Sequence, residues 1–409
     1  MYGKSTKVSR KKVLILAEYI GENHNSTAYY WSQIVKKLQQ EYDVILITPD
    51  TEYARGFSKQ YTVETRYVKF AKHNKNSLIS RLKGQLSQTR SFIRAVKVEL
   101  KSVDLVFSGT NPIVTMFGLS LLKFFKAFKW LVLVHDVFPN NLVPAKVITK
   151  SSFSYRILTT LSKKVYSSPE QLICIGRDMK ELLGKKTGKE SQIEFIPNWA
   201  STDRVTEIPK KQNELILELG WQDNTVFQFF GNMGRLQGIE QLLEAIGKTK
   251  CEKSRFLFIG CGSEVKQVQR VAKRINSEVG YERVHYYGRL DLEKNNLGLN
   301  ACDVALVTLA PGMFGLGVPS KAYFSMAANK PIIYVGDKNS ELERLLSEYE
   351  LGWYCNNGKV SELSRLLDHV SNLNCSGNLS QTRDVLISHF SEKIALDAIA
   401  NQVAKTVLL

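Results

Sequence analysis

Three glycines separate an apolar run from an amphipathic helical pattern near the middle of the chain. Gly231, Gly234 and Gly238 follow residues 226–230, which are apolar except for Gln228, and apolar residues recur at helical spacing over 239–246. Glycines in such a turn let backbone N–H groups approach a bound anion, and the N-terminus of the next helix favours negative charge. The spacing therefore predicts a turn that binds phosphate. Many strand-glycine-helix turns only connect elements, so this interpretation depends on the rest of the chain.

A histidine and a carboxylate form a second candidate centre. His135 and Asp136 lie at the end of an apolar run that begins at Trp130. Side chains at the carboxyl end of a parallel strand face the ligand-binding side of the sheet. A carboxylate there can accept the proton of an attacking hydroxyl, so Asp136 is the first choice for that role. In the structural alternative, Asp136 only caps the turn ahead of Pro139, and His135 is equally open to a structural role.

The elements that must position these residues alternate between strands and helices. Strands are expected at 13–17, 44–48, 62–70, 104–107, 130–135 and 172–175 in the first half, and at 226–230, 256–259, 284–287, 304–307 and 331–335 in the second. This rhythm predicts an α/β protein with two doubly wound, mostly parallel sheets. Ligands bind beyond the carboxyl ends of such strands, so two facing sheets should enclose a cleft.

The length of the chain agrees with two units, because 409 residues exceed what one core usually supports. Pro197 should end a strand, and the polar residues after it place the boundary near residue 205. The expected domains are an N-terminal Rossmann-like domain at 1–204 and a C-terminal one at 205–380. A helical segment at 381–409 follows, which can pack back toward the first domain.

The net charge of +17 is unevenly distributed. Residues 1–200 contain 32 Lys and Arg against 15 Asp and Glu, whereas residues 201–409 contain 24 of each kind. An excess in one half predicts an anionic partner for that half, either nucleic acid or an anionic membrane surface, with a solvated basic face as the alternative. The segment 121–130 alternates aromatic residues with Lys123, Lys126 and Lys129, which suits a helix at a bilayer interface, although its apolar side could also face the core.

Neither a secretion signal nor a membrane-spanning helix is expected. The apolar run 13–17 is too short for a signal peptide, and three lysines interrupt the apolar region 117–134. The six cysteines are scattered without a Cys-x-x-Cys pair, which favours a reducing compartment. A cytoplasmic protein is the simplest expectation.

Seven segments, in order along nearly the whole chain, resemble the GT-B glycosyltransferases of family 4. They are 175–183, 196–199, 230–238, 259–262, 287–289, 301–305 and 319–331. Within that family, His135-Asp-Val-Phe-Pro139 and the Gly-Asn-Met-Gly turn at 231–234 are most similar to bacterial enzymes of the N-acetylfucosaminyltransferase type. Those enzymes extend lipid-linked sugars for O-antigen or capsule.

The resemblance implies two facing Rossmann-like domains and a retaining hexosyltransferase that needs no metal and no cofactor. The implied donor is a UDP-sugar, with an N-acetylated deoxyhexose as the expected sugar. The implied acceptor is a saccharide linked to polyprenyl diphosphate, met by a peripheral protein at the inner, anionic face of the plasma membrane. No nucleic acid is expected as a partner.

Two departures from the family pattern affect the expected site. Asn232 and Gln237 stand where many members carry an arginine and a lysine that contact the donor diphosphate. Leu316 and Phe324 stand where most members carry two glutamates. The nearby cations Arg235 and Lys321 can replace these contacts, since fixed N–H dipoles and cations can stabilise a leaving diphosphate without a metal. The expected catalytic residues are Asp136, His135, Lys321 and Arg235.

The remaining expected site residues come from both halves. The donor-binding residues are Gly231, Asn232, Gly234, Gln237, Gly260, Gly262, Arg289, Pro319 and Ser320. The acceptor-binding residues are Glu18, Asn23, His24 and Asn111, for which ordinary loop polarity is the alternative. No metal ligands are expected, because the chain lacks an Asp-x-Asp pair.

Two other functions stay open at this point. A GT-B sugar-nucleotide 2-epimerase would share the architecture, but it needs no lipid acceptor and would leave the charge of the first half unexplained. A basic nucleic-acid-binding protein would explain that charge but not the ordered sugar-nucleotide motifs.

Overall fold

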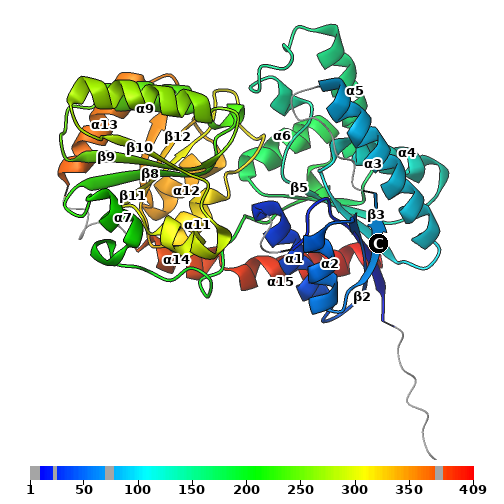
Figure 1. Ribbon diagram of the computed structural model, residues 1–409. Helices are drawn as coiled ribbons and strands as arrows, with labels where there is room; N and C mark the ends of the chain where they lie inside the picture. Colours follow the sequence, from blue (N-terminus) through cyan, green and yellow to red (C-terminus); the bar gives the residue numbers. More distant parts are fainter. Residues whose placement is uncertain (1–9, 22–24, 70–77, 374–380) are drawn as a thin grey trace, which may run out of the picture.

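The computed structural model describes residues 10–21, 25–69, 78–373 and 381–409. Two parallel sheets form the centres of two α/β domains, as Figure 1 shows. The first sheet has the order β3-β2-β1-β4-β5-β6-β7 and the second the order β10-β9-β8-β11-β12-β13. Every strand pair between neighbours is parallel. The expected fold class of two doubly wound domains is therefore confirmed.

The elements of the first domain follow the predicted alternation. Its strands are β1 (Lys12–Leu16), β2 (Asp43–Pro49), β3 (Glu64–Val68), β4 (Leu105–Gly109), β5 (Trp130–Val134), β6 (Gln171–Cys174) and β7 (Ile193–Phe195). Its helices are α1 (Ser26–Leu38), α2 (Glu52–Gln60), α3 (Leu78–Glu99), α4 (Ile113–Phe125), α5 (Phe153–Tyr166) and α6 (Arg177–Thr187). All residues of β4 and β5 are buried, because helices cover both faces of a parallel sheet.

The second domain repeats the pattern. Its strands are β8 (Thr225–Asn232), β9 (Ser254–Cys261), β10 (Val284–Gly288), β11 (Val304–Thr308), β12 (Ile332–Gly336) and β13 (Gly352–Asn356). Its helices are α7 (Glu214–Leu219), α8 (Ile239–Gly247), α9 (Val265–Val279), α10 (Asn295–Leu299), α11 (Lys321–Ala327), α12 (Glu341–Tyr349) and α13 (Val360–Asn372), followed by α14 (Thr382–His389) and α15 (Glu392–Leu408). Stacked phenylalanines join β8 to β9 in the core, with ring centroids of Phe227 and Phe256 5.2 Å apart.

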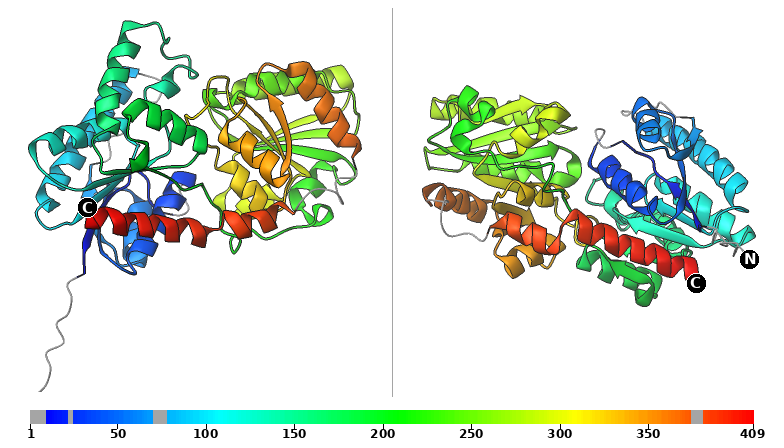
Figure 2. Two further views of the ribbon diagram at one scale, coloured as in Figure 1. Left: turned by 180° about the vertical axis from the view of Figure 1, so that it is seen from behind. Right: turned by 90° about the horizontal axis from the view of Figure 1, so that it is seen from below.

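The C-terminal helix α15 leaves the second domain and lies along the first (Figure 2). Lys37 of α1 forms an ion pair with Asp397 of α15 at 2.5 Å, and the Tyr29 hydroxyl donates to Glu392. The Lys129 ammonium donates to the carbonyl of Val407 at 2.6 Å. These contacts join the end of the chain to the first sheet.

The interpretation of 121–130 as one interfacial helix is wrong. Helix α4 ends at Phe125, the backbone of Lys126 is extended, and β5 begins at Trp130. Lys123 forms an ion pair with Glu170 at 2.6 Å, so this lysine, like Lys129, is engaged within the protein. Within the described part of the chain, no helix is long and apolar enough to cross a membrane.

Candidate active site

The glycine turn connects β8 to α8 and is supported by the neighbouring strand. Gly231 and Gly238 have φ angles of 124° and 61°, which side chains disfavour. A Cβ at Gly260, in β9, would lie 1.9 Å from the carbonyl oxygen of Gly231. A Cβ at Gly262 would lie 2.3 Å from the carbonyl oxygen of Met233. Gly260 and Gly262 therefore allow close backbone packing that holds the turn.

The structure does not require glycine at residue 234. Its φ is −101°, which any residue adopts, and a Cβ there would meet only the side-chain amide of Asn232, at 3.0 Å. The positions that require glycine are Gly231 and Gly238 in the turn, and Gly260 and Gly262 beside it.

A cavity of about 610 Å³ lies on one side of the turn, and both domains line it. The second domain contributes the end of β8, the 3-10 helix Leu292–Lys294 and the start of α11. The first domain contributes the start of α1 and the segment 201–205. Five of the expected donor-binding residues line this cavity: Gly231, Asn232, Gln237, Pro319 and Ser320.

Lys321 also lines this cavity, and its ammonium lies at the glycine turn. Its Nζ donates to Oε1 of Gln237 at 2.8 Å and lies 3.7 Å from the ring centroid of Phe229. Gln237 is the position at which the family pattern places a lysine. Burial lowers the pKa of Lys321 from 10.5 to about 7, because the loss of hydration disfavours the charged ammonium.

Ser320 immediately precedes α11 but does not cap this helix. It has helical backbone angles, and its side chain makes no capping hydrogen bond. Its hydroxyl hydrogen bonds instead with Tyr30, whose own hydroxyl donates to the carbonyl of Trp199 at 3.0 Å. The ring of Tyr30 stacks with His135 at a centroid distance of 6.3 Å. Tyr30 thus connects His135 of the first domain to Ser320 of the second.

His135 and Asp136 lie where the two domains touch. Burial lowers the pKa of His135 to about 4, so the imidazole is neutral at pH 7. Burial raises the pKa of Asp136, and a hydrogen bond from Asn111 opposes this shift. A Cβ at Gly317 would lie 3.5 Å from Oδ1 of Asp136, so this carboxylate faces the loop that precedes α11 in the second domain. The backbone N–H of Val137 donates to the carbonyl of Leu316 at 3.3 Å.

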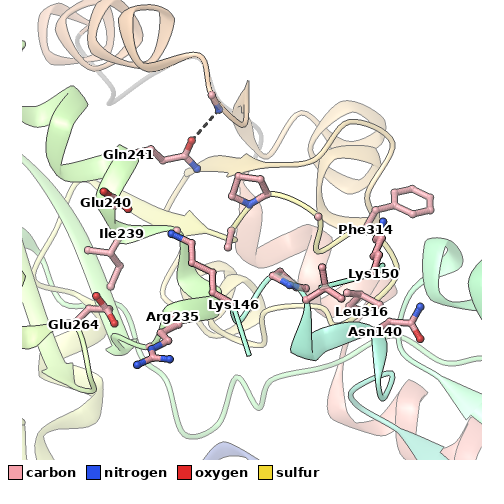
Figure 3. A pocket seen from close by; sticks show the side chains of 18 of the residues that line it. Asn140, Lys146, Lys150, Arg235, Ile239, Glu240, Gln241, Glu264, Phe314 and Leu316 are labelled. Atoms are coloured by element: carbon pink, nitrogen blue, oxygen red, sulfur yellow. Dashed lines mark hydrogen bonds between the residues drawn. The ribbon is translucent and has the colours of Figure 1, made fainter. Parts of the chain in front are cut away.

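A larger cavity of about 910 Å³ lies on the other side of the turn (Figure 3). Gly234, Arg235 and Gly238 line it from the turn, and Leu316 lines it from the loop before α11. The first domain contributes residues from 140 to 155. Arg235 and Lys321, the two cations expected to act together, therefore line different cavities.

The other expected residues are placed less centrally. Glu18 follows β1 and is half-buried, and burial raises its pKa to about 7, with an opposing hydrogen bond from Tyr19. Arg289 is exposed after β10. Asn23 and His24 lie outside the described residues. Where side chains are described, no group of three or more His, Cys, Asp or Glu residues could hold a metal ion.

Sequence reasoning missed the first-domain wall of the smaller cavity. Asn25 caps α1 by accepting from the N–H of Ala28 at 2.9 Å, and Tyr29 follows on the same helix. The guanidinium of Arg204 lies 5.5 Å from the ring centroid of Tyr29. From the sequence, each residue has an ordinary local explanation. Asn25 can be read as a helix cap, Tyr29 as a core aromatic residue and Arg204 as a charged residue of the linker. Only the approach of the two domains brings them to one cavity.

We expect Gly260→Ala to disrupt the turn. The added Cβ would overlap the Gly231 carbonyl and occupy a φ of 139°, so the free energy of unfolding should fall by about 2 to 4 kcal/mol. Gly280→Ala is the matched control, since φ there is 79° and a Cβ meets no atom within 4 Å. Gly280→Ala should lower the free energy of unfolding by only about 1 kcal/mol. Urea unfolding of both variants measures the difference, and equal losses would show that the turn tolerates displacement.

Comparisons with known proteins agree with this geometry. Residues 224–371 match the family model described as "Glycosyl transferases group 1". The chain is 43% identical over 390 residues to "Probable glycosyltransferase WbjE" of Pseudomonas aeruginosa, covering 95% of this chain and 96% of that protein.

Solved structures show the same fold. HepE of Anabaena, crystallised with UDP and glucose, has a TM-score of 0.72 at 14% identity, over 97% of this chain and 100% of that one. WaaG, described as a glycosyltransferase involved in lipopolysaccharide biosynthesis, has a TM-score of 0.61 at 11% identity, over 92% and 99%. The expected arrangement of two facing GT-B domains is confirmed.

Proposed function

The chain belongs to the group 1 glycosyltransferases, and on that premise we propose that it transfers a sugar from a UDP-sugar to a lipid-diphosphate-linked saccharide of a bacterial surface polysaccharide. The observation that carries the proposal is the smaller cavity, where the glycine turn and the Lys321 ammonium meet. The UDP bound to HepE supports the donor, and the involvement of WaaG in lipopolysaccharide biosynthesis supports the process. An N-acetylated deoxyhexose is the proposed sugar, transferred with retention.

In the proposed mechanism, the donor diphosphate lies between the glycine turn and Lys321. Negative charge grows on the β-phosphate as the sugar leaves, and preorganised N–H groups with a cation stabilise it. Gln237 fixes the ammonium at the turn, so Lys321 supplies the charge that the family pattern assigns to residue 237. Asp136, in the wall beside the loop before α11, accepts the proton of the acceptor hydroxyl.

A panel of nucleotide sugars tests the donor. We expect UDP-sugars to raise the melting temperature more than GDP-, CMP- or dTDP-sugars do, because a ligand that binds only the folded state stabilises it by mass action. UDP at about 100 times its Kd should add about 2.7 kcal/mol. A shift with no uridine nucleotide, or a preference for another base, would overturn the proposed donor.

We also propose that the first domain docks on anionic lipid through α4 and α5, which pack side by side. Large apolar side chains are exposed on both helices: Leu121, Phe124 and Phe125 on α4, and Phe153, Ile157 and Leu161 on α5. Phe124 and Phe153 are 83% and 78% exposed. The exposed cations Lys126, Arg156, Lys163 and Lys164 accompany them. Apolar side chains flanked by lysine and arginine suit a bilayer interface.

Replacing Phe124 and Phe125 with serine should weaken binding to vesicles that contain phosphatidylglycerol. Burying one phenylalanine contributes about 1.5 to 3 kcal/mol, so we expect at least a tenfold loss in partitioning. Leu217→Ser with Ile387→Ser is the matched control, because these side chains are exposed apolar residues of the second domain and α14. Cosedimentation at low and high salt provides the measurement. A wild-type protein that stays in the supernatant at low salt would refute membrane docking.

The two alternatives predict different products. A 2-epimerase would change the configuration of the nucleotide sugar without any acceptor. A nucleic-acid-binding protein would bind random DNA in preference to anionic vesicles, and this binding would fall steeply with salt.

A further inference from the structure

The larger cavity of about 910 Å³ is separate from the smaller cavity that is proposed to hold the donor. It lies between the domains, and its walls are the segment 140–155 on one side and the glycine turn, α8 and the loop before α11 on the other (Figure 3). We propose that this cavity binds the diphosphate of the lipid-linked acceptor through Lys146, Lys150 and Arg235. The inference rests on the proposed function and names the part of the acceptor that the cavity recognises.

Three cations of the cavity wall are free to bind an anion. Lys146, Lys150 and Arg235 line it and are exposed. Among the described residues, none of these three side chains has a hydrogen-bond or ion-pair partner. Lysine and arginine are the usual ligands of phosphate groups, and a cleft between two domains strengthens their field.

The backbone at Lys146 adds an independent observation. Its φ is 57°, a left-handed conformation that lysine rarely adopts. Its N–H donates to the carbonyl of Val143 at 2.9 Å, which closes the turn after the 3-10 helix Asn140–Leu142. The preceding residues are anchored by Lys186, whose ammonium donates to Oδ1 of Asn140 at 2.8 Å. A strained conformation held by its surroundings is a common feature of ligand sites.

The carboxylates of the cavity lie on the opposite wall. Glu240 and Glu244 belong to α8, and Glu264 precedes α9. Glu244 forms an ion pair with Lys248 at 2.8 Å, and Glu264 accepts from the hydroxyl of Ser263 at 2.9 Å. The first-domain wall carries Lys146 and Lys150 and no carboxylate among its described lining residues. The diphosphate therefore lies nearer the first-domain wall, and Arg235 contacts it from the opposite wall.

The two cavities share their central walls, which would bring donor and acceptor together. Gly231 and Gln237 line the smaller cavity, whereas Gly234 and Gly238 of the same turn line the larger. Leu316 lines the larger cavity and Val318 the smaller, while Gly317 between them faces Asp136. A saccharide that extends from the larger cavity would thus approach a donor sugar beside Asp136.

The larger cavity also adjoins the proposed membrane surface. Tyr155 of α5 lines the cavity, while Phe153 and Ile157, two residues away on either side, are exposed. A lipid-linked saccharide holds its diphosphate at the level of the lipid head groups. Docking of α5 on the bilayer would place Lys146 and Lys150 at that level.

Farnesyl diphosphate, a soluble isoprenoid diphosphate, is the probe for this site. Titration calorimetry is carried out with the smaller cavity saturated by UDP, and Lys146→Ala with Lys150→Ala is compared with the wild type. We expect the double variant to bind the probe at least tenfold more weakly. Lys59→Ala with Lys185→Ala is the matched control, because it removes the same charge from exposed first-domain positions that line neither cavity.

Two results would overturn the inference. One is a wild-type protein that binds UDP but not farnesyl diphosphate, and the other is a double variant that binds the probe as well as the control does. UDP affinity is measured separately and should be unchanged in both variants, which also shows that they are folded. Absence of UDP binding by the wild type would instead refute the proposed function.

Discussion

Replacing Asp136 with asparagine is expected to lower sugar transfer about 100-fold or more while UDP binds as before, because positioned proton acceptors typically contribute about 100- to 10,000-fold. The substitution keeps the shape of the side chain next to Gly317 and removes its charge. Asp136 also lies outside the lining of the smaller cavity, so donor affinity should not change. Initial rates of transfer and the Kd for UDP are the two measurements.

Asp104→Asn is the matched control for this substitution. Asp104 pairs with Lys11 at 2.9 Å just ahead of β4, at the opposite end of the first sheet from Asp136. Its replacement should leave transfer within about twofold of wild type, since surface ion pairs contribute little. Transfer by Asp136→Asn at the rate of this control would show that Asp136 is structural.

Lys321→Met is expected to lower turnover at least tenfold, about 1.4 kcal/mol, because it removes the cation at the leaving diphosphate. Methionine is an unbranched side chain of similar length, but it lacks the ammonium that lies 3.7 Å from the ring centroid of Phe229. Lys273→Met, at an exposed position on α9, is the control for the charge change. Unaltered turnover in Lys321→Met would remove this residue from the mechanism.

The titration of the Lys321 ammonium should make UDP binding depend on pH. In the free protein the pKa of Lys321 is about 7, so the side chain is charged below that pH and neutral above it. The diphosphate favours the charged form, so UDP binding above pH 7 should take up a proton. UDP affinity should then fall with rising pH by at most about tenfold per unit. Calorimetry at pH 8 in buffers of different ionisation enthalpy should detect this proton, and Lys321→Met should lose it.

The free energy of unfolding should rise with pH, whereas the affinity for UDP should fall. The folded pKa of Lys321 lies below its unfolded value of 10.5, so between these values the unfolded chain binds more protons. The contribution of Lys321 to the free energy of unfolding should therefore rise as pH increases from 7. The penalty for burying its charge is fully present below pH 7.

Much of the fold was predictable because its signals are local. Each apolar run expected as a strand forms one, since buried parallel strands require apolar residues on both faces. Strand β13 was missed, because Gly352 and polar residues interrupt its apolar pattern. The end of α4 was also missed. The backbone becomes extended at Lys126, although the alternation of aromatic residues with lysines continues to Lys129 and gives no local sign of this break.

The candidate site was predictable only in part. The glycine turn is contiguous, so its position follows from the chain itself. The contact of Lys321 with Gln237 spans 84 residues, and only the fold brings the two together. Lys146 and Lys150 occupy a stretch without a recognisable motif, and their importance depends on the cavity between the domains. The backbone conformation of Gly234 does not require glycine, and its expected contact with the donor stays a prediction.

The proposed sugar transfer can be tested with a radiolabelled UDP-sugar and lipid-linked saccharides extracted in butanol from cells that make the protein. We expect that label moves into the butanol phase, that UDP is released in equal amount, and that the anomeric configuration of the donor is retained. Lys321→Met and Asp136→Asn should both reduce the amount of label that reaches the butanol phase. Label that stays on the nucleotide, either unchanged or with an altered sugar configuration, would contradict the proposed sugar transfer.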